Sequence, residues 1–288
     1  MKAMRYWFTS MAMSVILLLS PLTARRGVGT QRREDLPGPS REQLVALERL
    51  KRSSRGDVTI RWNERNWTPT FLRGRLGVVR NVRPGAANRR RARQLELSEA
   101  AIRDVGAAEQ FLKRYKRLFK IRHPGREFIL REHTVDSLGM KHLTFDQYYK
   151  GIPVWASSLI VHINRAGEIY AINGRYEPTP RQLRSAKARI PAERAIQIAV
   201  DDLKRTVQFQ PIPPHVNEAM KYRGPSAEKV IFHERDTGRP HLAWQVSIRP
   251  NVRDHWYYFV DATDGRIIFR YNATAQQKPS PLGPVKPE

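Results

Sequence analysis

The chain has 288 residues, 40% of them hydrophobic, which is enough to bury one or two cores. Its 52 lysines and arginines exceed its 27 aspartates and glutamates, and the formal net charge of +25 favours polyanionic partners such as nucleic acid, anionic lipid or acidic surface polymers. It contains no cysteine, which excludes disulfides, a thiol nucleophile, an iron–sulfur site and a cysteine-ligated zinc site.

The first 24 residues have the layout of a secretory signal peptide. Lys2 and Arg5 precede an apolar run from Met11 to Leu22, and Ala24 offers a cleavage position. The run is shorter than the roughly 20 residues that a transmembrane helix needs. We therefore predict export to the periplasm or the extracellular space, without a transmembrane span after signal cleavage. An uncleaved signal anchor is the alternative.

Residues 25–56 are predicted to form a basic linker and a short helix. Ser40 and Gln43 have the spacing of a capping box. Leucines then recur on one face of the expected helix: Leu44, Leu47 and Leu50. Two short extended segments follow, Val58–Trp62 and Thr68–Leu76.

The segment Asn81–Gln94 is predicted to be an exposed loop or linker. It is rich in arginine around Pro84 and Gly85. Cationic runs of this kind are usually solvated, and no aromatic residue is interleaved here to stack on a base. A nucleic-acid-binding arm is therefore the less favoured alternative, and we do not expect nucleic acid as a partner.

A helix is predicted over Ala107–Ile121, with strands after it. Its apolar face consists of Phe111, Leu112, Tyr115, Leu118 and Phe119. The rest of its surface is basic, so a membrane-surface helix is an alternative. Core packing is the better interpretation, because a strand meander follows and needs a cover. Its expected strands are Phe128–Val135, Lys141–Tyr149, Val154–Ile163 and Glu168–Asn173.

The same order of elements is expected a second time. Pro191 suits the first position of a helix, whose apolar stripe is Ala195, Ile196, Ala199, Val200 and Leu203. The strands expected after it are Lys229–Phe232, Leu242–Ile248, Trp256–Val260 and Arg266–Tyr271. We predict an α+β fold of two small modules, each an antiparallel sheet wrapped against a helix, at 57–180 and 181–272. Residues 273–288 are a proline-rich tail.

Two motifs carry a family resemblance. Gln147-Tyr148-Tyr149-Lys150-Gly151-Ile152-Pro153-Val154, with the turn at Gly167, resembles the propeptide (FTP domain) of fungalysin-type and thermolysin-type zinc metallopeptidases. The segments around Trp244 and from Trp256 through Asp261 to Gly265 resemble the PepSY domain that follows it in such precursors. The family-motif positions, which we expect to be mainly structural, are Gln147, Tyr149, Gly151, Pro153, Val154, Gly167, Trp244, Asp261 and Gly265.

Residue chemistry argues against an enzyme. A thermolysin-type zinc site needs His-Glu-x-x-His, and no histidine of the chain has a partner four residues away. His233-Glu234 begins the motif without its second ligand, so we interpret it as a strand end entering a turn. The carboxylate pairs Asp201/Asp202 and Asp261/Asp264 are interpreted as helix-surface and turn residues. We predict no cofactor and no metal.

The resemblance implies a non-catalytic, exported, propeptide-like protein. It would bind and inhibit, or assist the folding of, a thermolysin-type zinc metallopeptidase or another exported partner. Because the family's chain runs on from here toward the peptidase, the partner-contact candidates are Asn272, Ala273, Thr274 and Ala275. One alternative is a basic module that binds an anionic cell-surface polymer or lipid. Another is a truncated metallopeptidase precursor without its catalytic domain.

Overall fold

The computed structural model describes residues 38–54, 57–79, 82–180, 182–183 and 185–274. The predicted signal peptide at 1–24 and most of the predicted tail lie outside these residues. The described residues belong to one compact unit of the chain.

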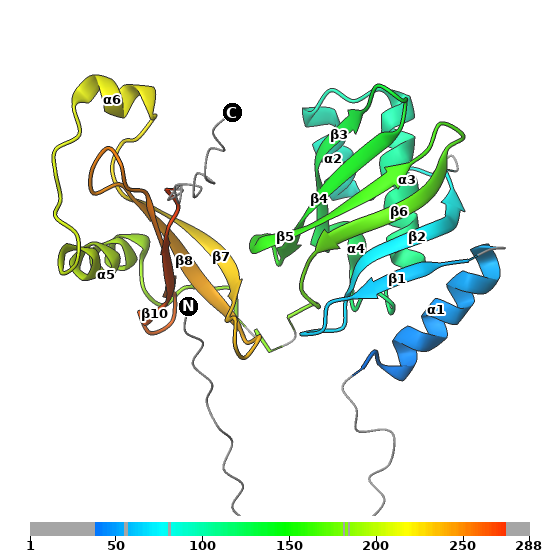
Figure 1. The fold of residues 1–288 in the computed structure, drawn as a ribbon, viewed down its shortest axis with the longest axis horizontal. Helices are drawn as coiled ribbons and strands as arrows, with labels where there is room; N and C mark the ends of the chain where they lie inside the picture. Colours follow the sequence, from blue (N-terminus) through cyan, green and yellow to red (C-terminus); the bar gives the residue numbers. More distant parts are fainter. Residues whose placement is uncertain (1–37, 55–56, 80–81, 181, 184, 275–288) are drawn as a thin grey trace, which may run out of the picture. The chain divides into compact units, whose positions relative to one another are not determined.

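An antiparallel sheet dominates the first part of this unit (Figure 1). The helices of this first part are α1 (Arg41–Ser54), α2 (Ala86–Gln94), α3 (Glu99–Arg114) and the short α4 (Pro124–Glu127). Its strands are β1 (Thr59–Trp62), β2 (Pro69–Val78), β3 (Phe128–Val135), β4 (Lys141–Tyr149), β5 (Ile152–Ile163) and β6 (Glu168–Arg175). They pair antiparallel in the order β1-β2-β6-β5-β4-β3.

A second antiparallel sheet follows in the chain. Its elements are α5 (Ala192–Lys204), α6 (Pro214–Ala219), β7 (Ser226–His233), β8 (Pro240–Ile248), β9 (Trp256–Asp261) and β10 (Ile267–Asn272). The four strands pair in chain order. The predicted apolar stripe of α5 covers one face of this sheet, where Ala195, Ala199 and Leu203 are buried together with Val246 and Tyr258.

One parallel contact joins the two sheets. Val154 of β5 pairs with Ile231 of β7, so the strands form a single ten-stranded sheet. A small apolar cluster surrounds this contact and includes Ile152, Leu242 and Ala262. The predicted α+β fold class is confirmed.

The hairpin between β4 and β5 has a two-residue loop. Tyr149 pairs with Ile152, and the loop residues Lys150 and Gly151 have φ angles of 51° and 80°. Two consecutive positive φ angles define the type I′ turn whose twist matches that of the flanking strands. Glycine at the second position removes the steric cost of this conformation.

The helix predicted over Ala107–Ile121 lies earlier in the chain than expected. α3 begins after Ser98, whose side chain accepts a hydrogen bond from Ala101 N, and it ends at Arg114. Tyr115, Leu118 and Phe119 lie in the turns after the helix but are buried in the same core as Phe111 and Leu112. All five predicted apolar residues are therefore core residues, and none is left for a membrane surface.

The exposed loop predicted for Asn81–Gln94 is wrong, because residues 86–94 form α2. Asn88 is fully buried and bonds the edge of β3: its Oδ1 accepts from Leu130 N at 2.9 Å, and its Nδ2 donates to Phe128 O at 3.0 Å. Arg91 Nε donates to Leu130 O at 3.1 Å. Two polar side chains of α2 thus satisfy backbone groups that an edge strand would expose.

None of the helices in the described part of the chain has the length and apolarity that crossing a bilayer requires.

Candidate functional site

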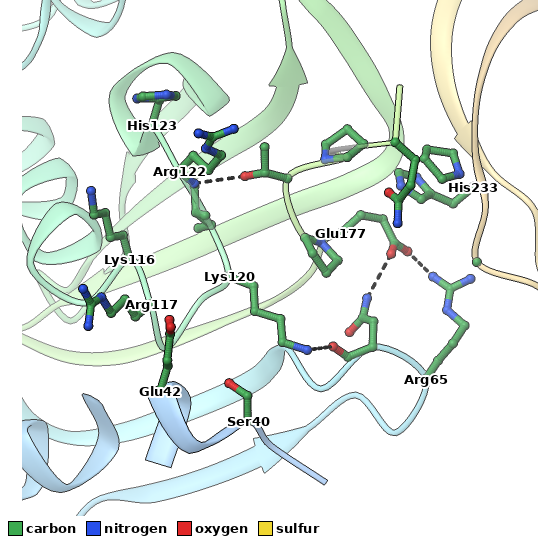
Figure 2. A pocket seen from close by; sticks show the side chains of 18 of the residues that line it. Ser40, Glu42, Arg65, Lys116, Arg117, Lys120, Arg122, His123, Glu177 and His233 are labelled. Atoms are coloured by element: carbon green, nitrogen blue, oxygen red, sulfur yellow. Dashed lines mark hydrogen bonds and ion pairs between the residues drawn. The ribbon is translucent and has the colours of Figure 1, made fainter. Parts of the chain in front are cut away.

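A cavity of about 930 Å³ with many charged side chains in its lining lies among the described residues (Figure 2). It collects side chains from α1, the β1–β2 connection, the turns after α3, the segment after β6 and the β7–β8 hairpin. Its charged lining residues are Glu42, Arg65, Lys116, Arg117, Lys120, Arg122, Glu177 and Asp236. Five cationic groups face three acidic groups, so the lining carries two positive charges in excess.

The turn from Lys120 to His123 is fixed by buried acceptors. Glu127 Oε1 accepts from the backbone N–H groups of Arg122 at 3.1 Å and of His123 at 2.7 Å. Thr179 Oγ1 also accepts from Arg122 N at 3.0 Å, and it donates to Glu127 Oε2 at 2.6 Å. Both Glu127 and Thr179 are buried. The backbone of this turn therefore has one arrangement, from which the side chains of Arg122 and His123 line the cavity.

The carboxylate of Glu177 forms another wall of the cavity, and its charge is already neutralised by a cation. Glu177 accepts from Arg65 and, at 2.9 Å, from Asn66 Nδ2. Burial raises the pKa of Glu177, while the hydrogen bond from Asn66 and the charge of Arg65 oppose this rise. Lys120 Nζ donates to Asn66 O at 2.6 Å, and burial lowers the pKa of this amine. These contacts join the β1–β2 connection to the segment after β6.

Gln147, a residue of the first motif, holds the backbone of Glu177 in place. Gln147 is buried, its Nε2 donates to Glu177 O at 2.7 Å, and its Oε1 accepts from Glu177 N at 3.0 Å. Tyr149 on the same strand donates its hydroxyl to Leu183 O at 3.3 Å. Gln147 and Tyr149 of the first motif therefore fix the segment that leads from β6 toward the second sheet.

The other first-motif positions belong to turns and to the contact between the sheets. Gly151 occupies the β4–β5 turn, and Pro153 and Val154 follow it on β5, where Val154 contacts the second sheet. Gly167 has a φ angle of 75° in the β5–β6 turn.

The second-motif positions lie on β8, at the end of β9 and in the β9–β10 turn. Trp244 Nε1 donates to Ile190 O at 3.0 Å. Asp261 Oδ1 accepts from Thr263 N at 2.7 Å, and its Oδ2 lies 2.8 Å from His241 Nδ1. Burial acts to raise the pKa of Asp261, but these hydrogen bonds outweigh it and leave the pKa below its usual value. Gly265 closes the turn at a φ angle of 81°.

The predicted partner-contact residues are fixed as far as Thr274. Asn272 Nδ2 donates to Asp254 Oδ1 at 2.7 Å, Ala273 N donates to His255 O at 2.6 Å, and Thr274 Oγ1 donates to Arg253 O at 2.7 Å. Ala275 lies outside the described residues. An inserting segment would therefore have to begin after Thr274, and contact of these four residues with a partner stays a prediction.

The described histidines do not assemble into a metal centre. His233 ends β7 and Glu234 enters the turn to β8. His162 lies across the sheet from His142, with their Nδ1 atoms 2.7 Å apart, and also contacts Asn173. Across the part of the chain that the structure describes, no group of three or more His, Asp or Glu side chains could hold a metal ion.

Sequence reasoning missed the cavity. Its residues come from positions between 40 and 240, and no local spacing links Arg65, Arg122 and Glu177. The positive φ angle of Lys120, 54°, marks the turn in the structure but leaves no signature in the sequence.

Comparisons with known proteins match two parts of the chain. Residues 126–176 match the model of the Fungalysin/Thermolysin Propeptide Motif, FTP. Residues 189–271 match the model of the Peptidase propeptide and YPEB domain, PepSY. The chain carries an FTP motif followed by a PepSY domain. The predicted resemblance is confirmed, and propeptide-type domains alone are matched.

Curated relatives that match this chain include proteins named as peptidases. Thermolysin of Alicyclobacillus acidocaldarius subsp. acidocaldarius is 28% identical over 232 residues, which cover 78% of this chain and 36% of the relative. Thermostable neutral protease NprT of Geobacillus stearothermophilus is 28% identical over 240 residues, covering 81% and 38%. Bacillolysin of Bacillus subtilis (strain 168) is 28% identical over 177 residues, covering 61% and 32%. The chain thus spans about a third of the length of these relatives.

A solved structure, the Bacillus megaterium YpeB C-terminal domain, aligns with this chain. The alignment covers 75% of this chain and 75% of the chain of the solved structure. The sequence identity is 14% and the TM-score is 0.30.

Proposed function

We propose that this chain is a non-catalytic, exported, propeptide-like protein that binds a thermolysin-type zinc metallopeptidase or another exported partner. The observation that carries the proposal is the order FTP then PepSY in a chain of which 78% aligns with thermolysin. Export rests on the predicted signal peptide at 1–24 and on the kinship with peptidase propeptides.

Binding of this kind accounts for both inhibition and folding assistance. A protein that binds only the folded or nearly folded partner stabilises that state by mass action. If the contact covers the partner's cleft, the same complex blocks substrate. One binding surface can therefore serve both roles.

The edge strand β10 is one surface suited to such a partner. Among the described residues, β10 is the terminal strand in the sheet order and pairs with β9 alone. An unpaired edge can add an extended segment of another chain through backbone hydrogen bonds. The anchored residues Asn272–Thr274 hold the end of this strand in place.

The test is inhibition of a purified thermolysin-type peptidase encoded by the same organism. Initial rates should fall to a plateau as the folded full chain is added, and the refolding yield of the denatured peptidase should rise. The heat-unfolded chain and an unrelated protein of similar pI are the controls. Unchanged rates and unchanged refolding yields at about a hundredfold molar excess would count against the proposal.

Binding of an anionic polymer or lipid is the second candidate. It is favoured by the net charge of +25 and by the cationic excess of the cavity. Salt separates the two candidates, because association with a polyanion weakens steeply as ionic strength rises. A shape-matched complex with a peptidase should lose much less affinity.

A further inference from the structure

We propose that the cavity binds an acidic segment of the partner polypeptide through Lys116, Arg117 and Arg122. This inference rests on the proposed function and specifies what the partner must present. The three side chains have no partner inside the protein: within the described residues, no hydrogen bond or ion pair involves them. Each of the three is exposed and lines the same hollow (Figure 2).

The other charges of the cavity are compatible with an anionic ligand. Glu177 is paired with Arg65 and therefore does not repel an incoming carboxylate. The remaining acidic groups are the exposed Glu42 and Asp236. Because the lining carries an excess of two positive charges, a segment with two carboxylates would neutralise it.

The backbone that carries the three side chains is fixed before binding. Ile121 N donates to Lys116 O at 2.9 Å, and Thr179 N donates to Lys120 O at 3.1 Å. Arg122 N has two buried acceptors, Glu127 and Thr179. Little backbone freedom remains to be lost on binding, which favours affinity.

The lining favours a polypeptide over a bilayer or a linear polymer. A flat membrane contacts the groups that protrude from a protein, whereas here Asn66, Thr179 and Pro178 share a concave surface with the cations. The exposed side chains of His123 and Gln182 also line the cavity and can hydrogen-bond a peptide backbone. Carboxylates of Asp, Glu or a chain terminus supply the charge.

Peptide binding provides the first test. A fluorescent peptide of alternating Glu and Gly is titrated with the folded full chain, beside the Gln–Gly peptide and beside vesicles of phosphatidylglycerol and phosphatidylcholine. We expect saturable binding of the Glu peptide and at least tenfold weaker binding of the Gln peptide. Stronger binding to the vesicles than to the Glu peptide would overturn the inference in favour of a membrane, and equal binding of both peptides would remove the role of charge.

A matched pair of variants provides the second test. Lys116→Gln/Arg122→Gln removes two cavity cations, and Arg93→Gln/Arg103→Gln removes two exposed cations outside the cavity. The first variant should bind the Glu peptide about tenfold more weakly, and the second should bind like the wild type. Arg117→Gln replaces the first variant if circular dichroism shows that it fails to fold. Equal losses in both variants would overturn the inference.

The same variants separate this inference from the proposed function. If the wild type inhibits the peptidase and the cavity variant inhibits it equally, the acidic-segment inference fails and the proposed function stands. If the wild type neither inhibits nor binds the peptidase, the proposed function fails, and the peptide titration still decides whether the cavity takes carboxylates.

Discussion

At the scale of single residues, the most informative side chain is Gln147. Its amide makes two buried hydrogen bonds to the backbone of Glu177. Gln147→Leu would leave a buried N–H and a buried C=O without partners, each at a cost of about 1–3 kcal/mol. We expect a loss of about 2–4 kcal/mol in the free energy of unfolding, measured by urea denaturation.

The matched control for Gln147 is Gln110→Leu, because Gln110 is exposed on α3. That change should alter the free energy of unfolding by less than about 0.5 kcal/mol. Equal effects of the two substitutions would show that the motif glutamine does not hold the segment after β6.

His233 makes the stability depend on pH. Burial, and to a smaller extent the charges of Arg65 and His241, lowers the pKa of His233 from 6.5 to about 4. The unfolded chain therefore binds a proton at higher pH than the folded chain, so this contribution to stability is complete above pH 6.5 and declines as the pH falls toward 4. A shift of this size corresponds to about 3 kcal/mol.

We expect His233→Gln to reduce the loss of unfolding free energy between pH 7 and pH 4 by about 3 kcal/mol. Urea denaturation at both pH values measures this difference. The exposed His215→Gln is the control. Identical pH dependence in the wild type and in His233→Gln would show that His233 is not a source of acid sensitivity.

At the scale of elements, one glutamine anchors the start of α1, in addition to its buried leucines Leu47 and Leu50. Gln43 Nε2 donates to Trp67 O at 2.5 Å and to Leu118 O at 3.0 Å, while Gln43 Oε1 accepts from Ser40 N at 3.1 Å. The predicted capping box therefore also attaches the helix to the body of the protein. Gln43→Ala should expose α1 to local opening, and amide hydrogen exchange in Arg41–Ser54 should accelerate roughly tenfold or more.

The neighbouring change Glu42→Ala removes an exposed side chain from the same helix. It should leave the exchange rates in the rest of α1 close to those of the wild type. Uniform acceleration by both substitutions would contradict a specific anchoring role of Gln43.

Helices and strands in which apolar residues recur at a regular spacing could be predicted from the sequence. Those whose contacts are made by small or polar side chains could not. β5 includes the whole of the predicted strand Val154–Ile163, because alternating burial along most of it leaves a clear pattern. The first half of α3 was missed because its contacts use alanine and glycine: a Cβ at Gly106 would lie 1.8 Å from Val82 O. α2 was missed because its inward side chains are Asn88 and Arg91, whose partners lie on β3.

The candidate site was predictable only in part, for the same physical reason. The motif containing Gln147 and Gly151 is contiguous in the sequence, so it could be recognised. The cavity exists only after α1, the turns after α3 and the β7–β8 hairpin have come together. Its cations looked like solvated surface charges because local sequence does not specify which of them lack acidic partners.

At the scale of the whole molecule, the large positive charge and the propeptide domains lead to one interpretation. Much of the charge is spread over exposed arginines and lysines, but the cavity gathers cations on a fixed backbone beside a neutralised carboxylate. The overall positive charge of the chain would speed the encounter with an acidic partner surface. The cavity would then select the acidic segment that binds. Moderate salt should therefore reduce the association rate more than it increases the dissociation rate.

The proposed function is binding of a zinc peptidase by a chain that is not itself one. Titration calorimetry of the full chain against a purified thermolysin-type peptidase from the same organism tests it most directly, with the peptidase saturated by an active-site inhibitor as the parallel sample. We expect saturable one-to-one binding that the inhibitor weakens. The absence of binding heat, together with separate elution of the two proteins in gel filtration, would contradict it.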